Sequence, residues 1–175
     1  VYNEKTENFK TGNVINKTYE YDTKGNTTKL TVSKIANGAK TEMYSYSYTY
    51  YDDGKLETEK HIVAGATEQP VIKYTYDNNG NVVSKVLSNG SNENDVKVTS
   101  SYSYNLANEC VTEVHNNGTG YNYEYSYTYT PDGNVLESSL SKKEKRIKTI
   151  YTYDRLNRLT SEEQQEYNKG DLSDE

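Results

Sequence analysis

The chain has 175 residues, a formal net charge of −6 and a pI near 5.1. That length suits one domain. The acidic balance argues against nucleic acid as a partner, because phosphate binding needs clustered Lys and Arg. No apolar run is long enough to span a membrane.

Aliphatic residues are scarce, since Leu, Ile, Val and Phe number 29 of 175. Such a composition indicates disorder when the net charge is high. Here the charge is modest and 20 Tyr residues supply apolar area instead. We therefore expect an ordered sheet without a thick core.

A Tyr-x-Tyr pair followed by a Gly or Asn recurs along the chain. The Gly or Asn, four residues after the second Tyr, is called the anchor below. The six anchors are Gly25, Gly54, Gly80, Asn108, Gly133 and Asn157. A degenerate copy is expected at Gly12. An internal repeat of this length indicates one supersecondary unit copied in series, which buries its apolar face only against its neighbours.

The residues before each anchor predict a hairpin turn. Asp, Asn or Thr stands three residues before five anchors, and these side chains start type I turns. Pro131 has the fixed φ that suits the first central position of such a turn. Gly and Asn enter the left-handed region at the least cost. We predict a three-residue hairpin loop, a type I turn followed by a left-handed residue.

This turn predicts that the second Tyr of each pair lies opposite the residue two after the anchor. The packing residues expected to do so are Tyr21, Tyr50, Tyr76, Tyr104, Tyr129 and Tyr153. In five of the six copies the opposite residue is apolar, a pairing that stabilises antiparallel strands.

Strands with strict alternation fill the intervals between turns. Tyr44, Tyr46, Tyr48 and Tyr50 alternate with Ser and Thr, and the segment 121–129 repeats the arrangement. Further turn signals lie between the anchors, at 37–38, 65, 89–90, 117–118 and 141–145. The predicted fold is all-β, with antiparallel hairpin repeats forming one long curved meander sheet over residues 1–167. Residues 168–175 are expected to form an acidic, frayed tail.

No catalytic, metal or cofactor site is expected. Cys110 occupies a position that is apolar in other copies, which favours a small buried hydrophobe over a nucleophile. His61 and His115 lack partners at ligand spacing and are expected to be solvated strand or turn residues. The segment 77–81 faintly resembles a calcium loop, but turn chemistry already explains it. A basic cluster within 142–148 is expected to keep a sheet edge soluble.

The segment Tyr-Thr-Tyr-Asp-Arg-Leu-Asn-Arg-Leu-Thr, residues 151–160, resembles the YD repeat of Rhs-type proteins, whose signature is Y-x-Y-D-x-x-G-R-L. Residues 74–82 and 19–26 are similar to it too, and the resemblance extends from about residue 12 to 167. The family includes polymorphic toxins, toxin-complex subunits and teneurins. In it, many repeats form a sheet that spirals into a hollow shell, which in the toxins encloses a C-terminal toxic domain.

The chain departs from the family pattern in three ways. Its repeats are longer, it lacks the D-P-x-G segment at which the toxin shells end, and its six or seven hairpins are too few to close a shell. The resemblance therefore implies either a segment of a larger secreted or cell-surface protein or a small stand-alone relative.

Two functions follow as hypotheses. The first is a non-catalytic wall or scaffold whose partners are other repeats of the same or a longer chain. The second is an extracellular binding module whose Tyr rows stack on a glycan or dock a protein. The candidate ligand-stacking residues are Tyr44, Tyr46, Tyr121 and Tyr123. An open sheet also leaves two edge strands that can pair between copies.

Overall fold

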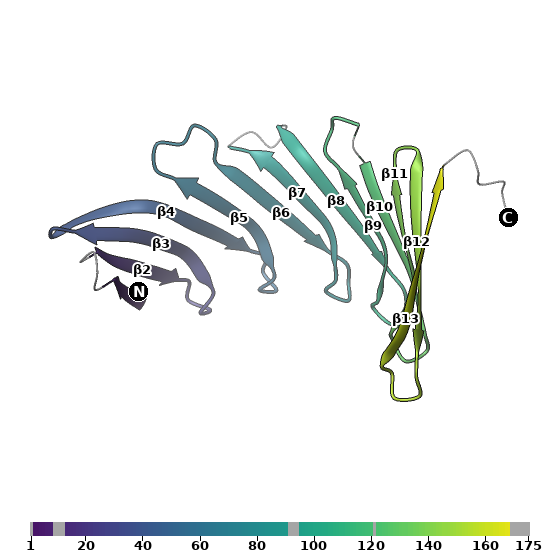
Figure 1. The fold of residues 1–175 in the computed structure, drawn as a ribbon. Helices are drawn as coiled ribbons and strands as arrows, with labels where there is room; N and C mark the ends of the chain where they lie inside the picture. Colours follow the sequence, from purple (N-terminus) through teal and green to yellow (C-terminus); the bar gives the residue numbers. More distant parts are fainter. Residues whose placement is uncertain (1, 9–12, 91–94, 121, 169–175) are drawn as a thin grey trace. The chain divides into compact units, whose positions relative to one another are not determined.

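The computed structural model describes residues 2–8, 13–90, 95–120 and 122–168. These residues form thirteen antiparallel strands in one sheet whose spatial order follows the sequence (Figure 1). The strands are β1 (Tyr2–Asn8), β2 (Asn13–Tyr21), β3 (Thr27–Ala36), β4 (Ala39–Tyr50), β5 (Leu56–Val63), β6 (Pro70–Tyr76), β7 (Val82–Asn89), β8 (Val96–Tyr104), β9 (Cys110–Asn116), β10 (Asn122–Tyr129), β11 (Val135–Lys142), β12 (Lys145–Tyr153) and β13 (Leu159–Asn168). The all-β hairpin meander predicted from the sequence is confirmed. Among the described residues no helix is long and apolar enough to cross a membrane.

Contacts divide the chain into two compact units. Unit 1 comprises residues 1–74 and 86–96, and unit 2 comprises residues 75–85 and 97–175. The single domain expected over residues 1–167 stays a prediction. Asn168 ends β13, whereas the rest of the expected tail and the degenerate copy at Gly12 lie outside the described residues.

The anchor turns have the predicted conformation. Each of the six anchors has a positive φ, from 59° at Asn157 to 91° at Gly25. In the first hairpin the Gly25 N–H donates to the Asp22 carbonyl at 3.2 Å, and the Asp22 N–H donates to the Asn26 carbonyl at 2.9 Å. The same two hydrogen bonds close the other five turns. The loop is thus the three-residue hairpin connection, in which only the anchor needs the left-handed region.

The predicted register is confirmed in five hairpins. The pairs are Tyr21 with Thr27, Tyr50 with Leu56, Tyr104 with Cys110, Tyr129 with Val135, and Tyr153 with Leu159. The pair Tyr76 with Val82 stays a prediction.

The left-handed anchor itself forms a first bulge. A second β-bulge follows in the same five hairpins, one residue beyond the predicted pair. In the fourth hairpin Tyr104 faces Cys110, yet Ser103 faces Thr112, so Val111 is the extra residue. Because side chains alternate with period two, one extra residue moves every later side chain of the return strand to the other face.

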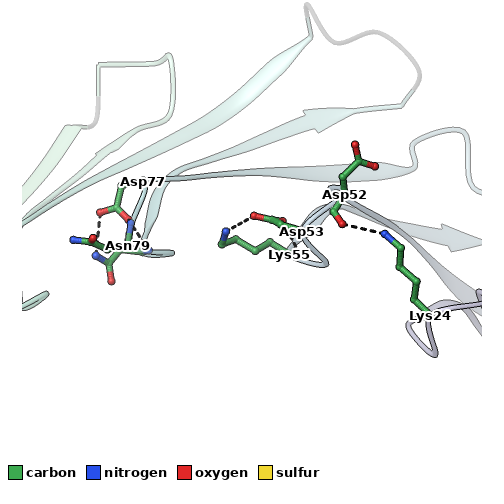
Figure 2. Close-up of polar contacts among 7 residues, drawn as sticks. Lys24, Asp52, Asp53, Lys55, Asp77 and Asn79 are labelled. Atoms are coloured by element: carbon green, nitrogen blue, oxygen red, sulfur yellow. Dashed lines mark hydrogen bonds and ion pairs between the residues drawn. The ribbon is translucent and has the colours of Figure 1, made fainter.

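Turn side chains bind the backbone of their own loops. The Asp77 carboxylate accepts the N–H groups of Asn79 and Asn81 at 2.9 and 2.8 Å, and the Asn81 amide at 3.0 Å (Figure 2). These contacts lower the pKa of Asp77, with the Asn81 side chain as the largest cause. The pKa of Asp22 is lowered in the same way by Asn26, and that of Asp154 by the N–H of Arg158. The loop that resembles a calcium site is therefore a turn held by its own carboxylate.

The second hairpin has Tyr51 in place of this Asp, and Asp53 compensates. Its carboxylate accepts the Lys55 N–H at 3.1 Å and the Lys55 amine, as Figure 2 shows. The Asp52 carbonyl accepts the Lys24 amine at 3.0 Å, so neighbouring turns of unit 1 are joined. A changed turn residue is thus tolerated where another carboxylate of the same loop lies within reach.

Burial is unusual because small polar residues are the most covered. Val32 is the one buried apolar residue within the described ranges, at 4 % exposure, while Ser33 and Ser45 are each 1 % exposed. In a single layer the short side chains lie beneath their longer neighbours. Apart from Tyr21, the Tyr residues whose burial is described stay half-buried. The sheet has a tyrosine face, which carries Tyr44, Tyr46 and Tyr48, and a serine face, which carries Ser45 and Ser47.

Substitution of Gly25 tests the turn. A Cβ at Gly25 would meet nothing within 4 Å, so only the backbone opposes a side chain there. We expect Gly25→Val to lower the free energy of unfolding by about 1–2 kcal/mol, measured by urea denaturation. The matched control Gly25→Asn introduces the residue found at Asn108 and Asn157 and should cost less. Equal effects of the two variants would contradict the left-handed turn.

The lowered pKa of Asp77 makes a pH prediction. A carboxyl whose folded pKa lies below its unfolded value stabilises the fold above about pH 5, and this stabilisation disappears as the pH falls through about 3.9 and below. Asp77→Asn keeps the acceptor oxygen, as Asn105 does in its own turn. The variant should therefore lose less stability than the wild-type chain between pH 7 and pH 2.5 in thermal melts.

The control for this pH series is Asp52→Asn, because no described hydrogen bond involves the Asp52 carboxylate, which points away from Lys24 in Figure 2. Asp52→Asn should show the wild-type pH dependence. Identical pH profiles for Asp77→Asn and Asp52→Asn would refute the role of the turn carboxylate.

Candidate functional site

The second Tyr of the repeated pair connects its hairpin to the preceding one. Its hydroxyl donates a hydrogen bond to the backbone carbonyl of the residue two after the previous anchor. Four such bonds are described: Tyr50 to Thr27 at 2.7 Å, Tyr104 to Val82 at 2.8 Å, Tyr129 to Cys110 at 2.6 Å, and Tyr153 to Val135 at 2.7 Å. We call these four bonds the tyrosine ladder.

Burial at the ladder changes the acidity of its hydroxyls. Desolvation raises the pKa of Tyr50, Tyr104 and Tyr129, with nearby carboxylates adding to the effect. These side chains are neutral donors over the physiological range. Tyr21, by contrast, is 46 % exposed, so the first hairpin lacks this degree of packing.

An aromatic cluster lies on the tyrosine face of unit 1. The ring of His61, on β5, stacks on Tyr46 with centroids 4.6 Å apart, and Tyr44 meets both rings edge-on. Tyr48 stacks beside Tyr46 at 6.4 Å. The Nε2 atom of His61 is buried without a hydrogen-bond partner. Leaving a buried polar atom unpaired costs about 1–3 kcal/mol, so this histidine is not what packing alone would select.

A hydrogen-bonded chain of polar residues lies on the tyrosine face of unit 2. The Ser100 hydroxyl lies 2.7 Å from His115 Nδ1, and His115 Nε2 lies 2.7 Å from the Glu113 carboxylate. Tyr102 and Tyr125 meet the His115 ring edge-on at 6.4 and 6.2 Å. Both histidines lie on strands, as expected, but they are half-buried among tyrosines and not solvated.

Both histidines occupy the same place in the repeat, which sequence reasoning missed. Each histidine stands seven residues after its anchor, and a Glu stands five residues after the same anchor. Without the second bulge these positions would belong to the serine face. The bulge turns them to the tyrosine face, where Glu113 lies opposite Tyr102 and His115 opposite Ser100.

The Ser-His-Glu chain has the residue types of a hydrolase triad but not its access. Ser100 is 8 % exposed. A nucleophile must reach its substrate, and an oxyanion site must stand beside it. The three side chains satisfy one another's hydrogen-bonding groups. In the described part of the chain, no group of three His, Cys, Asp or Glu side chains is arranged to hold a metal ion.

Cys110 lies half-buried opposite Tyr104, and its Sγ donates to the Thr112 carbonyl at 3.3 Å. Burial raises the pKa of the Cys110 thiol, with Glu113 adding to the effect. A thiol with a raised pKa is a poor nucleophile at neutral pH. This environment matches the small hydrophobe that the repeat position predicts.

The candidate ligand-stacking residues do not share one environment. Tyr44 and Tyr46 belong to the cluster with His61, and Tyr121 lies outside the described residues. Tyr123 is half-buried, and the Lys142 amine lies 4.9 Å from its ring centroid. Ligand stacking by these residues stays a prediction.

Comparison with known proteins supports a related repeat fold. The crystal structure of TcdB2-TccC3-TEV, a toxin-complex protein with Rhs/YD repeats, is similar over 89 % of this chain with a TM-score of 0.58 and 20 % identity. The chain spans 9 % of that protein. A porin-like protein from Bacteroides uniformis and a DUF3836 family protein from Parabacteroides distasonis, each 12 % identical, have TM-scores of 0.39 and 0.20, too low to indicate a shared fold. No family model and no curated protein matches the sequence.

Removal of one ladder hydroxyl tests its energetic role. Tyr129→Phe deletes the 2.6 Å bond to the Cys110 carbonyl and should lower the free energy of unfolding by about 1 kcal/mol. The matched control is Tyr125→Phe on the same strand, since no described hydrogen bond involves its hydroxyl. The control should change stability by less than about 0.5 kcal/mol. If urea denaturation gives equal losses for both, the ladder has no special role.

Proposed function

We propose that this chain is a non-catalytic structural repeat segment, a wall or scaffold of a larger secreted or cell-surface protein of the Rhs/YD-repeat type. In the toxin members of that family such repeats belong to a shell around a C-terminal toxin. The corresponding proposal for this chain is that it forms part of such a shell.

The observation that carries the proposal is the tyrosine ladder. A hydroxyl on one hairpin bonds a backbone carbonyl on the previous hairpin, and this contact recurs four times. A bond to a carbonyl can recur whatever side chain stands there, as Thr27, Val82, Cys110 and Val135 illustrate. It is therefore a means of adding hairpins in series, which is what a wall requires.

Three further observations support the scaffold proposal. The buried Ser100 argues against catalysis by the one Ser-His-Glu chain described above. The similarity to a toxin-complex protein favours a secreted or cell-surface location. The exposed strand β13 offers an unpaired edge to another repeat, of the same chain or of a second copy.

The alternative is a stand-alone extracellular binding module that uses the tyrosine face for a glycan or a protein. The unpaired Nε2 of His61 beneath Tyr44 and Tyr46 favours it, because a polar atom retained at a cost in stability fits a ligand contact. This alternative function places the ligand in unit 1, at the His61 cluster.

The mass of the native protein separates the two functions. An antibody raised against this chain would capture the protein from its source for intact mass measurement, to be compared with 20.0 kDa. The scaffold proposal predicts a much larger mass. A mass near 20 kDa would refute membership of a larger wall and would direct the search to ligands of the His61 cluster.

A further inference from the structure

Neighbouring hairpins pair in one constant register. The residue four after an anchor lies opposite the residue seven before the next anchor, on the first strand of the next hairpin. The pairs of this kind that the structure describes are Lys29 with Ser47, Thr58 with Lys73, Thr112 with Ser126, and Glu137 with Ile150. Each hairpin thus joins the sheet at a fixed offset, and this rule determines what would lie opposite each residue of β13.

The tyrosine ladder has an unused acceptor position at Leu159. This residue stands two after its anchor, where the earlier hairpins carry the ladder carbonyl. The Asp154 N–H donates to the Arg158 carbonyl, so the next pair, Tyr153 with Leu159, is of the kind whose N–H and C=O groups point away from the hairpin. No described hydrogen bond reaches the Leu159 carbonyl. Its side chain is 53 % exposed, whereas Val135 at the same place in the previous hairpin is half-buried.

The strand that carries Leu159 is an acidic edge. Among the described strands β13 pairs with β12 alone, and its charged residues are Glu162, Glu163 and Glu166. Glu166 forms an ion pair with Lys145, while Glu162 and Glu163 form none with a described residue. The basic cluster within 142–148 was expected to keep a sheet edge soluble. That expectation is wrong, because β13 follows β12 in the sheet.

The constant register converts these charges into a requirement on the next strand. Glu163 stands six residues after its anchor, a place that lies opposite the residue nine before the next anchor. In the sixth hairpin that residue is Lys148, opposite Ser139. Glu166 corresponds in the same way to the place of Lys145. Because directly opposite residues share a face, a strand like β12 would bring a Lys to each glutamate on its own side of the sheet.

A second copy of this chain does not meet this requirement. Its own β13 would bring two acidic edges together, and like charges that lie opposite each other destabilise a strand pair. Its β1 precedes the degenerate copy at Gly12, where Asn8 stands four residues before the anchor and Asn3 stands nine before it. The sequence of β1 therefore supplies neither the ladder tyrosine nor the positive charge.

We propose that the β13 edge docks a further tyrosine hairpin whose first strand is basic. A Tyr four residues before its anchor donates to the Leu159 carbonyl, and a Lys or Arg nine residues before that anchor lies opposite Glu163. The inference rests on the scaffold proposal, because the occupant is another repeat of the larger protein. It adds a selection rule, since the fifth hairpin has the tyrosine but carries Glu124 at the basic place.

The test is fluorescence anisotropy of a labelled peptide of residues 145–168, the sixth hairpin, titrated with the full chain. We expect saturable binding that slows amide hydrogen exchange in β13 and not in β1. The Tyr153→Phe peptide, which lacks the ladder hydroxyl, should bind about fivefold more weakly. The matched control is the Tyr167→Phe peptide, because the Tyr167 hydroxyl bonds Gln165 of its own strand. No binding, or equal weakening by both substitutions, would overturn the proposal.

A charge exchange locates the contact. The Lys148→Glu peptide should bind the wild-type chain about five- to tenfold more weakly, because repulsion replaces attraction. Glu163→Lys in the chain should restore its binding. The control Glu162→Lys adds the same charge on the opposite face and should not restore it. Absence of rescue by Glu163→Lys would place the peptide elsewhere, such as in the position of the chain's own sixth hairpin, and would refute the docking.

Two further measurements separate the occupants. We expect the full chain to sediment as a monomer, whereas dimers that Glu163→Lys alters would make a second copy the occupant and refute the proposal. A native mass well above 20.0 kDa without peptide binding would overturn this docking and leave the scaffold proposal intact. A native mass near 20.0 kDa would refute the scaffold and, with it, the occupant named here.

Discussion

A hairpin in this chain presents more tyrosine surface than it can bury alone, and the contact that resolves this is a hydroxyl bonded to the neighbouring backbone. Tyr50, Tyr104, Tyr129 and Tyr153 each lie opposite their own return strand and at the same time donate to the hairpin before them. The acceptor belongs to the residue that pairs with the previous hairpin's tyrosine. Turn, register and ladder therefore depend on one another. The left-handed anchor determines which residue lies opposite the tyrosine of its hairpin, and the carbonyl of that residue accepts the hydroxyl of the next hairpin's tyrosine.

Sequence patterns revealed the parts of this arrangement that depend on residue type. Positive φ restricts the anchor to Gly or Asn, so the turn could be read at Gly133 as well as at Asn157, and the opposite residue followed from loop length. The acceptors of the ladder could not be predicted, because any residue supplies a carbonyl. The second bulge could not be predicted either, since its extra residue differs from one hairpin to the next: Thr28, Glu57, Val111, Leu136 or Thr160.

That unpredicted bulge decides the chemistry of the tyrosine face. It turns Glu113 and His115 toward Tyr102 and Ser100, and it gives His61 its place against Tyr46. The candidate site was therefore less predictable than the fold. The aromatic rows were visible in the alternation of residues 44–50, but the histidines within them were assigned to solvent. The repeated Glu and His at the same distances from Gly54 and Asn108 were the available signal.

The ladder also has a mechanical meaning. Each bond joins a hairpin only to the one before it, and the one buried aliphatic residue among the described positions is Val32. Within each unit, the described residues thus have no shared interior whose collapse would carry all the strands with it. Cohesion in such a chain is a sum of nearest-neighbour terms. A force applied to β13 would peel the hairpins of unit 2 away one after another, with a tyrosine–carbonyl bond breaking at each step. The neighbouring hairpins would stay intact, and the sheet would re-form from them when the load is released.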